Sequence, residues 1–355
     1  MNQEASSCLL LYCRAGFEKE CAQDITQACE NLGIAGWCKA SPNAGYVMFH
    51  PTQAGDMATL QKRLRFEDLT FSRQMIFARG PLALQSENRL PPLVEAARSL
   101  LGPFGQLWLE TADTNEAKEL SAFCRKFEPH LKKALIQANL LKLDVPKLPR
   151  LHVFFLDSST AWAGTSQPGH SSNWPMGIPR LRMPRGAPSR STLKLAEALL
   201  EMLSEQAREQ LRPGRRAIDL GASPGGWTWQ LVQRGMKVTA VDNGPMDATL
   251  MESGLVEHLR ADGFTFRPRY PIDWLVCDMV DKPARVVDLV ARWFERGDCR
   301  AALFNLKLPM KRRFEEVQLA RNVLESRLES TWRIRMRQLY HDREEITCLI
   351  VRENG

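Results

Sequence analysis

The chain has 355 residues, of which 44% are hydrophobic and 25% are charged, the composition of an ordinary folded protein. This length is too great for one typical domain and predicts two or three. No run of about 18 apolar residues occurs, and no signal-peptide pattern opens the chain, so we expect a cytoplasmic protein without a membrane span. The net charge of +7 and the pI near 9.0 permit a nucleic acid partner without requiring one.

The cysteines and histidines argue against a disulfide-stabilised protein and against a Cys/His metal site. The nine cysteines are odd in number and form no C-x-x-C pair, which argues against a disulfide framework. The six histidines pair with no cysteine at the spacing of metal ligands. We therefore expect free thiols and no metal site.

The first 167 residues predict two small α+β modules. In the first, residues 1–79, we expect strands at 7–13, 33–40, 45–50 and 69–78 and helices at 17–31 and 52–64. In the second, residues 80–167, we expect helices at 91–101 and 117–139 and strands at 106–111, 151–157 and 160–165. Residues 168–188 are rich in Pro, Gly, Ser and Asn, a composition typical of a linker.

Residues 189–355 alternate strands and helices with the regularity of an α/β domain. We expect strands at 217–221, 237–242, 257–261, 274–279, 301–308, 332–340 and 345–351, with helices between them. The last two strands are close enough in sequence to pair antiparallel. The pattern predicts an open, Rossmann-like sheet of seven strands with helices on both faces.

The first strand of this domain runs into a glycine-rich turn that opens a helix. The turn reads Gly221, Ala222, Ser223, Pro224, Gly225, Gly226 and Trp227. Glycines let backbone approach a ligand closely, and the helix that follows directs free N–H groups at the same place. The turn lacks the G-x-G-x-x-G pattern, so pyrophosphate binding is the weaker interpretation, and another nucleotide-like cofactor is favoured.

Acidic residues then follow the strands. Asp242 ends the second strand, where a carboxylate accepts hydrogen bonds from both hydroxyls of a ribose. Asp262 follows the third strand, where it is placed for an adenine amino group, and Asp278 ends the fourth. Together with Asp219 in the first strand, these carboxylates suit a positively charged cofactor without phosphate. S-adenosylmethionine fits this description and NAD fits poorly.

Methyl transfer to a nucleobase finds little support in the motifs. Base-amino methylation usually needs Asn/Asp-Pro-Pro-aromatic after the fourth strand, and this chain has Cys277, Asp278, Met279 and Val280 there. Methylation of pyrimidine C5 needs a nucleophilic cysteine, typically in a Pro-Cys pair, and none occurs. Lysines are conspicuous instead, since Lys307 lies in an apolar strand, where an unpaired charge is costly.

The chain resembles the FtsJ-like ribose 2′-O-methyltransferases in these motifs. Lys194, Asp278, Lys307 and Glu345 fall in the order and contexts of that superfamily's Lys-Asp-Lys-Glu tetrad. The segments Ser189–Leu195, Gly221–Trp227 and Asp342–Glu345 look like its motifs, which adds Ser189 to the cofactor-binding candidates. The whole chain resembles the ribosomal RNA large subunit methyltransferase M family, including its segments at residues 113–116 and 123–127. Ser223 stands where the family often has Cys, a small-for-small change that should not alter function.

The resemblance implies a fold, a reaction and roles for the four residues. It implies a ferredoxin-like module, a THUMP RNA-binding module and a methyltransferase domain, with methylation of a cytidine ribose in 23S rRNA. Lys307 would be the general base that takes the proton of the 2′-hydroxyl. Asp278 would orient Lys307, and Lys194 and Glu345 would position the ribose. Carboxylates raise the pKa of such a lysine, whereas burial and nearby cations lower it, and the residues alone do not decide the balance.

Three clusters of basic residues are the candidates for RNA contact. From them we select Arg125, Lys126, Lys132, Lys133, Arg182, Arg190, Lys311 and Arg312. Each cluster alone has an equally plausible interpretation as a solvated helix face. We expect 23S rRNA or a precursor of the large subunit as partner, and a monomer without an obligate protein partner. Two alternatives stay open: a base methyltransferase acting on RNA, and an RNA-binding assembly factor with an inactive methyltransferase domain.

Overall fold

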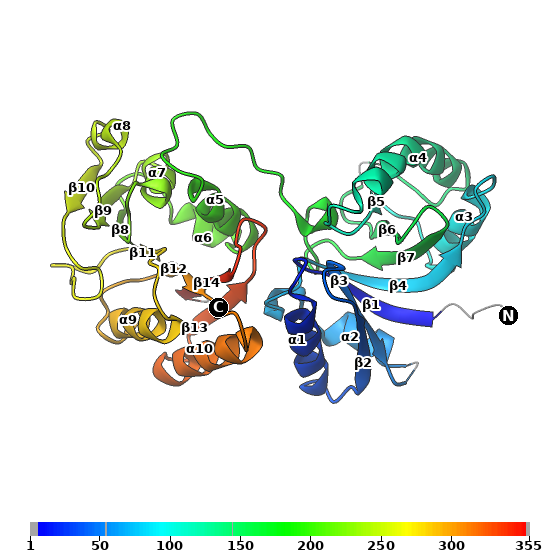
Figure 1. Cartoon of the computed structure of the whole chain (residues 1–355), viewed down its shortest axis with the longest axis horizontal. Helices are drawn as coiled ribbons and strands as arrows, with labels where there is room; N and C mark the ends of the chain where they lie inside the picture. The colour runs from blue at the N-terminus through cyan, green and yellow to red at the C-terminus, as the bar shows by residue number, and fades with distance from the viewer. Residues whose placement is uncertain (1–5, 54, 144, 353–355) are drawn as a thin grey trace. The chain divides into compact units, whose positions relative to one another are not determined.

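The computed structural model describes residues 6–53, 55–143 and 145–352. The chain divides between Pro179 and Arg180 into two compact units, here called unit 1 and unit 2 (Figure 1). Throughout the described ranges no helix has the length and apolar character needed to cross a membrane. Within the same ranges no three His, Cys, Asp or Glu side chains gather in a way that could hold a metal ion.

Unit 1 is built on one sheet that joins the two modules predicted from the sequence. Its strands are β1 (Ser6–Tyr12), β2 (Gly36–Ala40), β3 (Tyr46–Pro51), β4 (Gln74–Ala83), β5 (Gln106–Glu110), β6 (Arg150–Phe155) and β7 (Thr160–Ser166), in the order β2-β3-β1-β4-β7-β6-β5. Strand β4 pairs antiparallel with β1 on one side and with β7 on the other. It therefore belongs to both modules and crosses the boundary predicted at residue 79.

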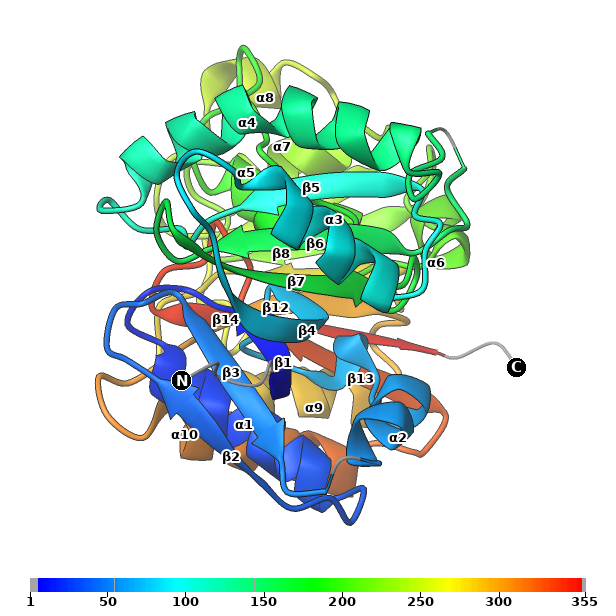
Figure 2. The same ribbon diagram turned by 90° about the vertical axis from the view of Figure 1, so that its right-hand side faces the viewer.

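The helices of unit 1 lie against the two halves of this sheet. They are α1 (Glu18–Glu30), α2 (Asp56–Arg63), α3 (Leu90–Ser99) and α4 (Lys118–Gln137), with short 3-10 turns η1 (Phe66–Asp68) and η2 (Pro175–Gly177). Figure 2 shows α3 and α4 over the half formed by β5 to β7, and α1 beside β2 and β3. The apolar residues of α3 and α4 fill a core with those of β5 to β7, which includes Phe104, Leu131, Leu135 and Phe155.

The strand predicted at 69–78 begins at Gln74 instead and runs on to Ala83. The carboxylate of Asp24 accepts hydrogen bonds from the backbone N–H groups of Thr70 and Phe71, at 2.7 and 3.0 Å. Those N–H groups are therefore not available to a neighbouring strand. Pairing with β1 begins only beyond them, where Gln74 lies opposite the last residue of that strand.

The first part of the predicted linker, residues 168–188, is fastened to unit 1. The side chain of Gln74 accepts a hydrogen bond from the backbone N–H of Ser172 at 3.1 Å. The buried guanidinium of Arg150 donates to the carbonyl of Ser172 at 3.1 Å. These contacts extend unit 1 to Pro179.

Unit 2 has the doubly wound architecture predicted from its alternating pattern. Its strands are β8 (Arg216–Leu220), β9 (Lys237–Val241), β10 (Val256–Leu259), β11 (Trp274–Cys277), β12 (Ala302–Lys307), β13 (Trp332–Arg337) and β14 (Glu345–Arg352), in the order β10-β9-β8-β11-β12-β14-β13. Strands β8 to β12 are parallel, and β14 is antiparallel to both β12 and β13. The carboxyl ends of the five parallel strands and the amino end of β14 therefore meet at one edge of the sheet.

Helices cover both faces of this sheet, as Figure 1 shows. They are α5 (Thr192–Glu201), α6 (Glu205–Glu209), α7 (Gly226–Val232), α8 (Ala248–Met251), α9 (Pro283–Glu295) and α10 (Arg313–Arg327). On one face α5 and α7 pack into a core that contains Trp227 and Trp274. Helices α9 and α10 lie on the other face, where Trp293 is buried. Each tryptophan of this size buries enough apolar surface to contribute on the order of 3 kcal/mol.

Candidate active site

The predicted glycine turn lies at the carboxyl end of β8 and leads into α7. Gly221 and Gly225 adopt positive φ angles of 78° and 117°, which side chains other than hydrogen rarely tolerate. Gly225 is the N-cap residue of α7, which begins at Gly226. The turn therefore has the strand–turn–helix context that the sequence predicts.

Close packing within unit 2 gives these glycines a second role. A Cβ atom at Gly226 would overlap the hydroxyl oxygens of Ser189 and Ser191, which are hydrogen-bonded to each other at 2.7 Å. A Cβ atom at Gly221 would lie 2.7 Å from the side chain of Met279. Ser189, a cofactor-binding candidate, therefore lies beside the turn, and the protein's own packing requires glycine at positions 221 and 226.

Replacing Gly226 by alanine should lower the free energy of unfolding by about 1–3 kcal/mol, because the new methyl group overfills a closed space. The φ angle of Gly226 is not positive, so the substitution tests packing rather than backbone strain. Chemical denaturation measures the effect. The control is Gly55→Ala, since a Cβ atom at Gly55 meets nothing within 4 Å. Equal stability of the two variants would contradict this account.

Asp242 and Asp262 follow neighbouring strands at the carboxyl edge of the sheet and differ in their hydrogen bonds. The carboxylate of Asp242 accepts hydrogen bonds from the backbone N–H groups of Ser223 at 3.1 Å and Gly244 at 2.7 Å. It therefore ties the end of β9 to the glycine turn. Asp262 is exposed and accepts from the backbone N–H of Phe264 at 2.9 Å. Both carboxylates keep lone pairs for a ligand.

Trp227 and Asp219 are placed differently from the other candidates. Trp227 belongs to the first turn of α7, and its side chain is 2% exposed and lies in the core between the helices and the sheet, so its backbone is the part available to a ligand at the turn. Asp219 lies inside β8, is 1% exposed and accepts a hydrogen bond from the hydroxyl of Thr228 at 2.6 Å. Burial, and to a lesser extent the charges of Asp278 and Asp242, raise the pKa of Asp219 to about 7.

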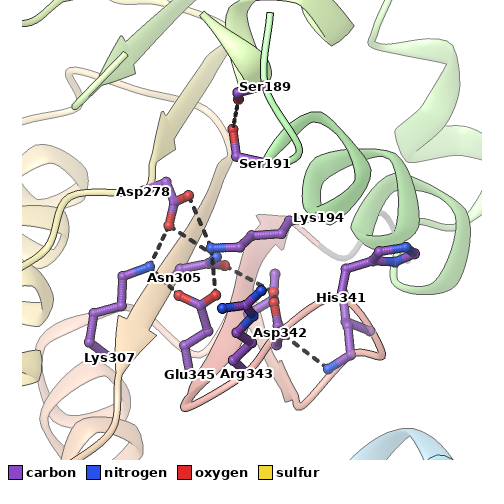
Figure 3. A network of polar contacts seen from close by, with 12 residues as sticks. Ser189, Ser191, Lys194, Asp278, Asn305, Lys307, His341, Asp342, Arg343 and Glu345 are labelled. Atoms are coloured by element: carbon purple, nitrogen blue, oxygen red, sulfur yellow. Dashed lines mark hydrogen bonds and ion pairs between the residues drawn. The ribbon is translucent and has the colours of Figure 1, made fainter. Parts of the chain in front are cut away.

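The four residues of the predicted tetrad lie in one network at the same edge (Figure 3). Lys194, from the first turn of α5, has its Nζ atom 3.3 Å from Asp278 and 2.5 Å from Glu345. Lys307, the last residue of β12, has its Nζ atom 2.6 Å from Asp278 and also pairs with Glu345. Each carboxylate thus bridges both ammonium groups. The cluster is largely buried and has no net charge.

The antiparallel course of β14 explains how Glu345 reaches Lys307. In the register of β12 and β14, Lys307 is directly opposite Glu345, and Asn305 is directly opposite Thr347. Side chains on one face of an antiparallel pair are about 5 Å apart at such positions. Pairing of the strands therefore assembles half of the network.

The carboxylates decide the protonation of Lys307. Burial lowers the pKa of Lys307, but the charges of Asp278 and Glu345, and the hydrogen bonds donated to them, outweigh it. The pKa of Lys307 is therefore raised above its ordinary value. The lysine is an ammonium ion at neutral pH in this state of the protein.

Asn305 is a member of the network that the sequence analysis missed. Its amide nitrogen donates to Asp278 at 3.2 Å, and its amide oxygen lies 2.9 Å from the hydroxyl of Thr347. Both residues are fully buried. The signal was present, since Asn305 precedes Lys307 by two positions in an apolar strand and so projects from the same face.

Glu197 holds the loop before β14 in place and was also missed. This buried carboxylate accepts hydrogen bonds from the backbone N–H groups of Tyr340 and His341, at 2.8 and 2.9 Å. The loop contains Asp342, a fully buried acid whose pKa burial raises well above its usual range. A glutamate in the middle of an amphipathic helix carries no local sign of this role.

The basic candidates lie on the surfaces of both units. On α4, Arg125, Lys126 and Lys133 are exposed and Lys132 is half-buried. In unit 2, Arg182, Arg190, Lys311 and Arg312 are exposed. Lys311 and Arg312 follow Lys307 by four and five residues, and Arg190 adjoins Ser189. Arg190 therefore lies close in sequence to Ser189, and Lys311 and Arg312 lie close to Lys307 of the tetrad.

Comparison with known proteins identifies the family. Three family models match in succession: "RlmM ferredoxin-like domain" at residues 6–76, "Ribosomal RNA large subunit methyltransferase M, N-terminal" at 88–167, and "FtsJ-like methyltransferase" at 187–323. The protein named Ribosomal RNA large subunit methyltransferase M of Methylococcus capsulatus is 55% identical over 345 residues, which cover 96% of this chain and 97% of that protein. Those of Azotobacter vinelandii and Thauera aminoaromatica are 50% and 48% identical and cover 97% and 96% of this chain, and 98% and 95% of their own lengths. The chain belongs to the ribosomal RNA large subunit methyltransferase M family.

Proposed function

We propose that the protein transfers the methyl group of S-adenosylmethionine to the ribose 2′-hydroxyl of a cytidine in 23S rRNA. The network of Lys194, Asp278, Lys307 and Glu345 carries this proposal, because it sets a paired lysine beside the glycine turn at the carboxyl edge of the sheet. In open α/β sheets, ligands bind at this edge. The names of the relatives supply the substrate, ribosomal RNA of the large subunit.

The residues at the turn fit S-adenosylmethionine by their chemistry. The carboxylates of Asp242 and Asp262 suit the ribose hydroxyls and the adenine amino group, and Asp278 suits positive charge. One carboxyl oxygen of Asp219 is buried and meets no hydrogen-bond partner among the described residues, so the floor of the turn also favours a cationic ligand. Ser189 and the backbone of residues 221–227 would complete the site.

The chain's own residues would then accept one proton, that of the 2′-hydroxyl. When bound, the cofactor supplies a methyl group made electrophilic by the sulfonium to which it is attached. The 2′-hydroxyl is a poor nucleophile, so Nζ of Lys307 would accept its proton as the hydroxyl oxygen takes up the methyl group. Lys307 must first lose its own proton, which Lys194 and a cationic ligand promote and Asp278 and Glu345 oppose.

We assign the remaining roles by position. Asp278 orients Lys307, and Asn305 holds Asp278 through its amide nitrogen. Lys194 and Glu345 position the ribose. Residues 80–167 act as a THUMP-like RNA-binding module, which presents the basic side chains of α4, and residues 189–355 form the catalytic domain.

The position of the methyl group on the product tests the proposal. In cells that lack the protein, one 2′-O-methylcytidine of 23S rRNA should disappear, and wild-type protein should restore it. Digestion of the rRNA to nucleosides and mass spectrometry distinguishes a methylated ribose from a methylated base. A methylated base at that position would show the protein to be a base methyltransferase. Unchanged rRNA modification together with tight RNA binding would favour the assembly-factor alternative.

A further inference from the structure

The amino edge of the unit 2 sheet, opposite the tetrad, carries a hollow lined by arginines. The hollow has a volume of about 540 Å³, and half of its eight lining residues are arginines: Arg212, Arg215, Arg216 and Arg300. Arg212 and Arg215 precede β8, Arg216 is its first residue, and Arg300 precedes β12. Strand β12 has six residues, so its two ends, and hence this hollow and Lys307, are about 17 Å apart.

The charge in this hollow is far from balanced. Its one carboxylate, Asp273, pairs with Arg215 at 2.7 Å and lies 3.9 Å from Arg300. In the described part of the chain, no carboxylate pairs with the exposed guanidinium groups of Arg212 and Arg216. The lining therefore has a net charge of +3. Three like charges held together at a surface repel one another unless an anion lies between them.

Residues next to the hollow extend it as a basic and aromatic surface. Pro271 lines it, and the two residues before, Arg269 and Tyr270, are exposed, the tyrosine by 69%. A second hollow of about 840 Å³ shares Arg215, Asp273 and Arg300. It adds two arginines, Arg296 and Arg352, and two acids, Glu295 and Glu329, so its lining has a net charge of only +1 and the basic character is concentrated in the first hollow. Guanidinium groups bind phosphate through paired N–H donors, and exposed aromatic rings stack on bases.

We infer that Arg212, Arg216 and Arg300 form a second RNA-binding site, which holds phosphates of the substrate RNA at the edge of unit 2 remote from the tetrad. The inference rests on the proposed function, since it needs an RNA substrate. The dipole of a neighbouring helix does not neutralise these arginines, because a helix carboxyl terminus carries only about half an elementary negative charge. A folded RNA is long enough to reach both edges of one domain, so this site anchors the substrate while the tetrad acts on it.

Binding of a 23S rRNA transcript to the full chain tests the site. The variant Arg212→Ala/Arg216→Ala/Arg300→Ala leaves Arg215 and its ion pair with Asp273 in place. Its affinity should fall about tenfold or more near physiological salt. The slope of log affinity against log salt, measured between about 50 and about 200 mM, should become shallower by about 2 to 3. The rate of methyl transfer at saturating RNA should be unchanged, because the tetrad is intact.

A matched control removes the same charge elsewhere. Lys19, Lys62 and Arg63 are exposed in α1 and α2 of unit 1, and their triple alanine variant should bind with nearly wild-type affinity and slope. The variant Arg212→Lys/Arg216→Lys/Arg300→Lys should retain most of the salt dependence, because it keeps the three positive charges. Retained binding in this variant would show that the alanine variant loses affinity through lost charge and not through misfolding.

Two outcomes would overturn the inference. Either the arginine variant binds the transcript with wild-type affinity and salt slope, or the control variant loses as much as the arginine variant does. Normal binding to the transcript with impaired binding to a precursor particle would assign the surface to a protein, and so would also overturn it. Failure of the proposed function looks different: the wild-type protein itself would then give no ribose methylation of 23S rRNA.

Discussion

Lys307→Ala should slow methyl transfer by about 10²–10⁴-fold at saturating cofactor and RNA, the usual contribution of a positioned general base. Lys307 lies between Asp278 and Glu345, and after its removal no other lysine of the tetrad lies at the end of β12. Single-turnover kinetics measure the chemical step. Binding of the cofactor, followed by calorimetry, should persist. Lys142→Ala, at an exposed position in unit 1, is the control.

Two further variants separate proton transfer from electrostatics. Lys307→Arg keeps the positive charge but cannot lose its proton, so it should be nearly as slow as Lys307→Ala. The wild-type rate should rise with pH, because the pKa of Lys307 is raised and only its neutral form accepts a proton. Glu345→Gln removes one of the charges that raise the pKa of Lys307, so it should move the pH–rate profile to lower pH. An active Lys307→Arg enzyme would show that Lys307 is not the base.

Asp219→Asn should stabilise the protein at alkaline pH by up to about 4 kcal/mol, the penalty for ionising a buried acid whose pKa is raised from 3.8 to about 7. Folded protein binds this proton more tightly than unfolded protein does. The penalty is therefore absent below about pH 4, grows as the pH rises to 7 and is constant above that value. Asparagine has the same size and still accepts the hydrogen bond from Thr228.

The measurement is the difference in free energy of unfolding between Asp219→Asn and the wild type, at pH 5 and pH 8. The difference should grow with pH in favour of the variant. Asp157→Asn is an informative control, because hydrogen bonds from Ser159 lower the pKa of Asp157. That variant should lose stability relative to the wild type at neutral pH, and the loss should vanish in acid. If the difference in free energy of unfolding between Asp219→Asn and the wild type does not change with pH, the pKa of Asp219 is not raised in the folded protein.

The tetrad could be predicted from the sequence because each of its members stands in a distinctive local sequence context. Lys307 interrupts an apolar strand, Asp278 ends one, and Lys194 and Glu345 stand in recognisable motifs. The α/β alternation likewise predicted the seven strands of unit 2 and the antiparallel pairing of β13 and β14. These features depend on neighbours along the chain, which periodicity and turn chemistry report.

What the sequence could not predict depends on partners distant along the chain. Nothing local shows that β14 inserts between β12 and β13, or that β4 joins two modules in one sheet. The shortened start of β4 depends on Asp24, some 50 residues earlier. The pKa of Lys307 is a balance of opposing effects, and only the distances to its carboxylates decide it.

The place of Glu345 at the start of β14 also sets the time at which the proposed tetrad can first be complete. Residues of the tetrad enter the chain at positions 194, 278, 307 and 345, and the last of them opens the last strand. A ribosome making this protein therefore completes the cofactor turn and both lysines more than thirty codons before it adds the second carboxylate. Until β14 has left the exit tunnel and paired with β12, Lys307 has one carboxylate partner where the folded protein gives it two, and the proposed catalytic site of the nascent chain is incomplete.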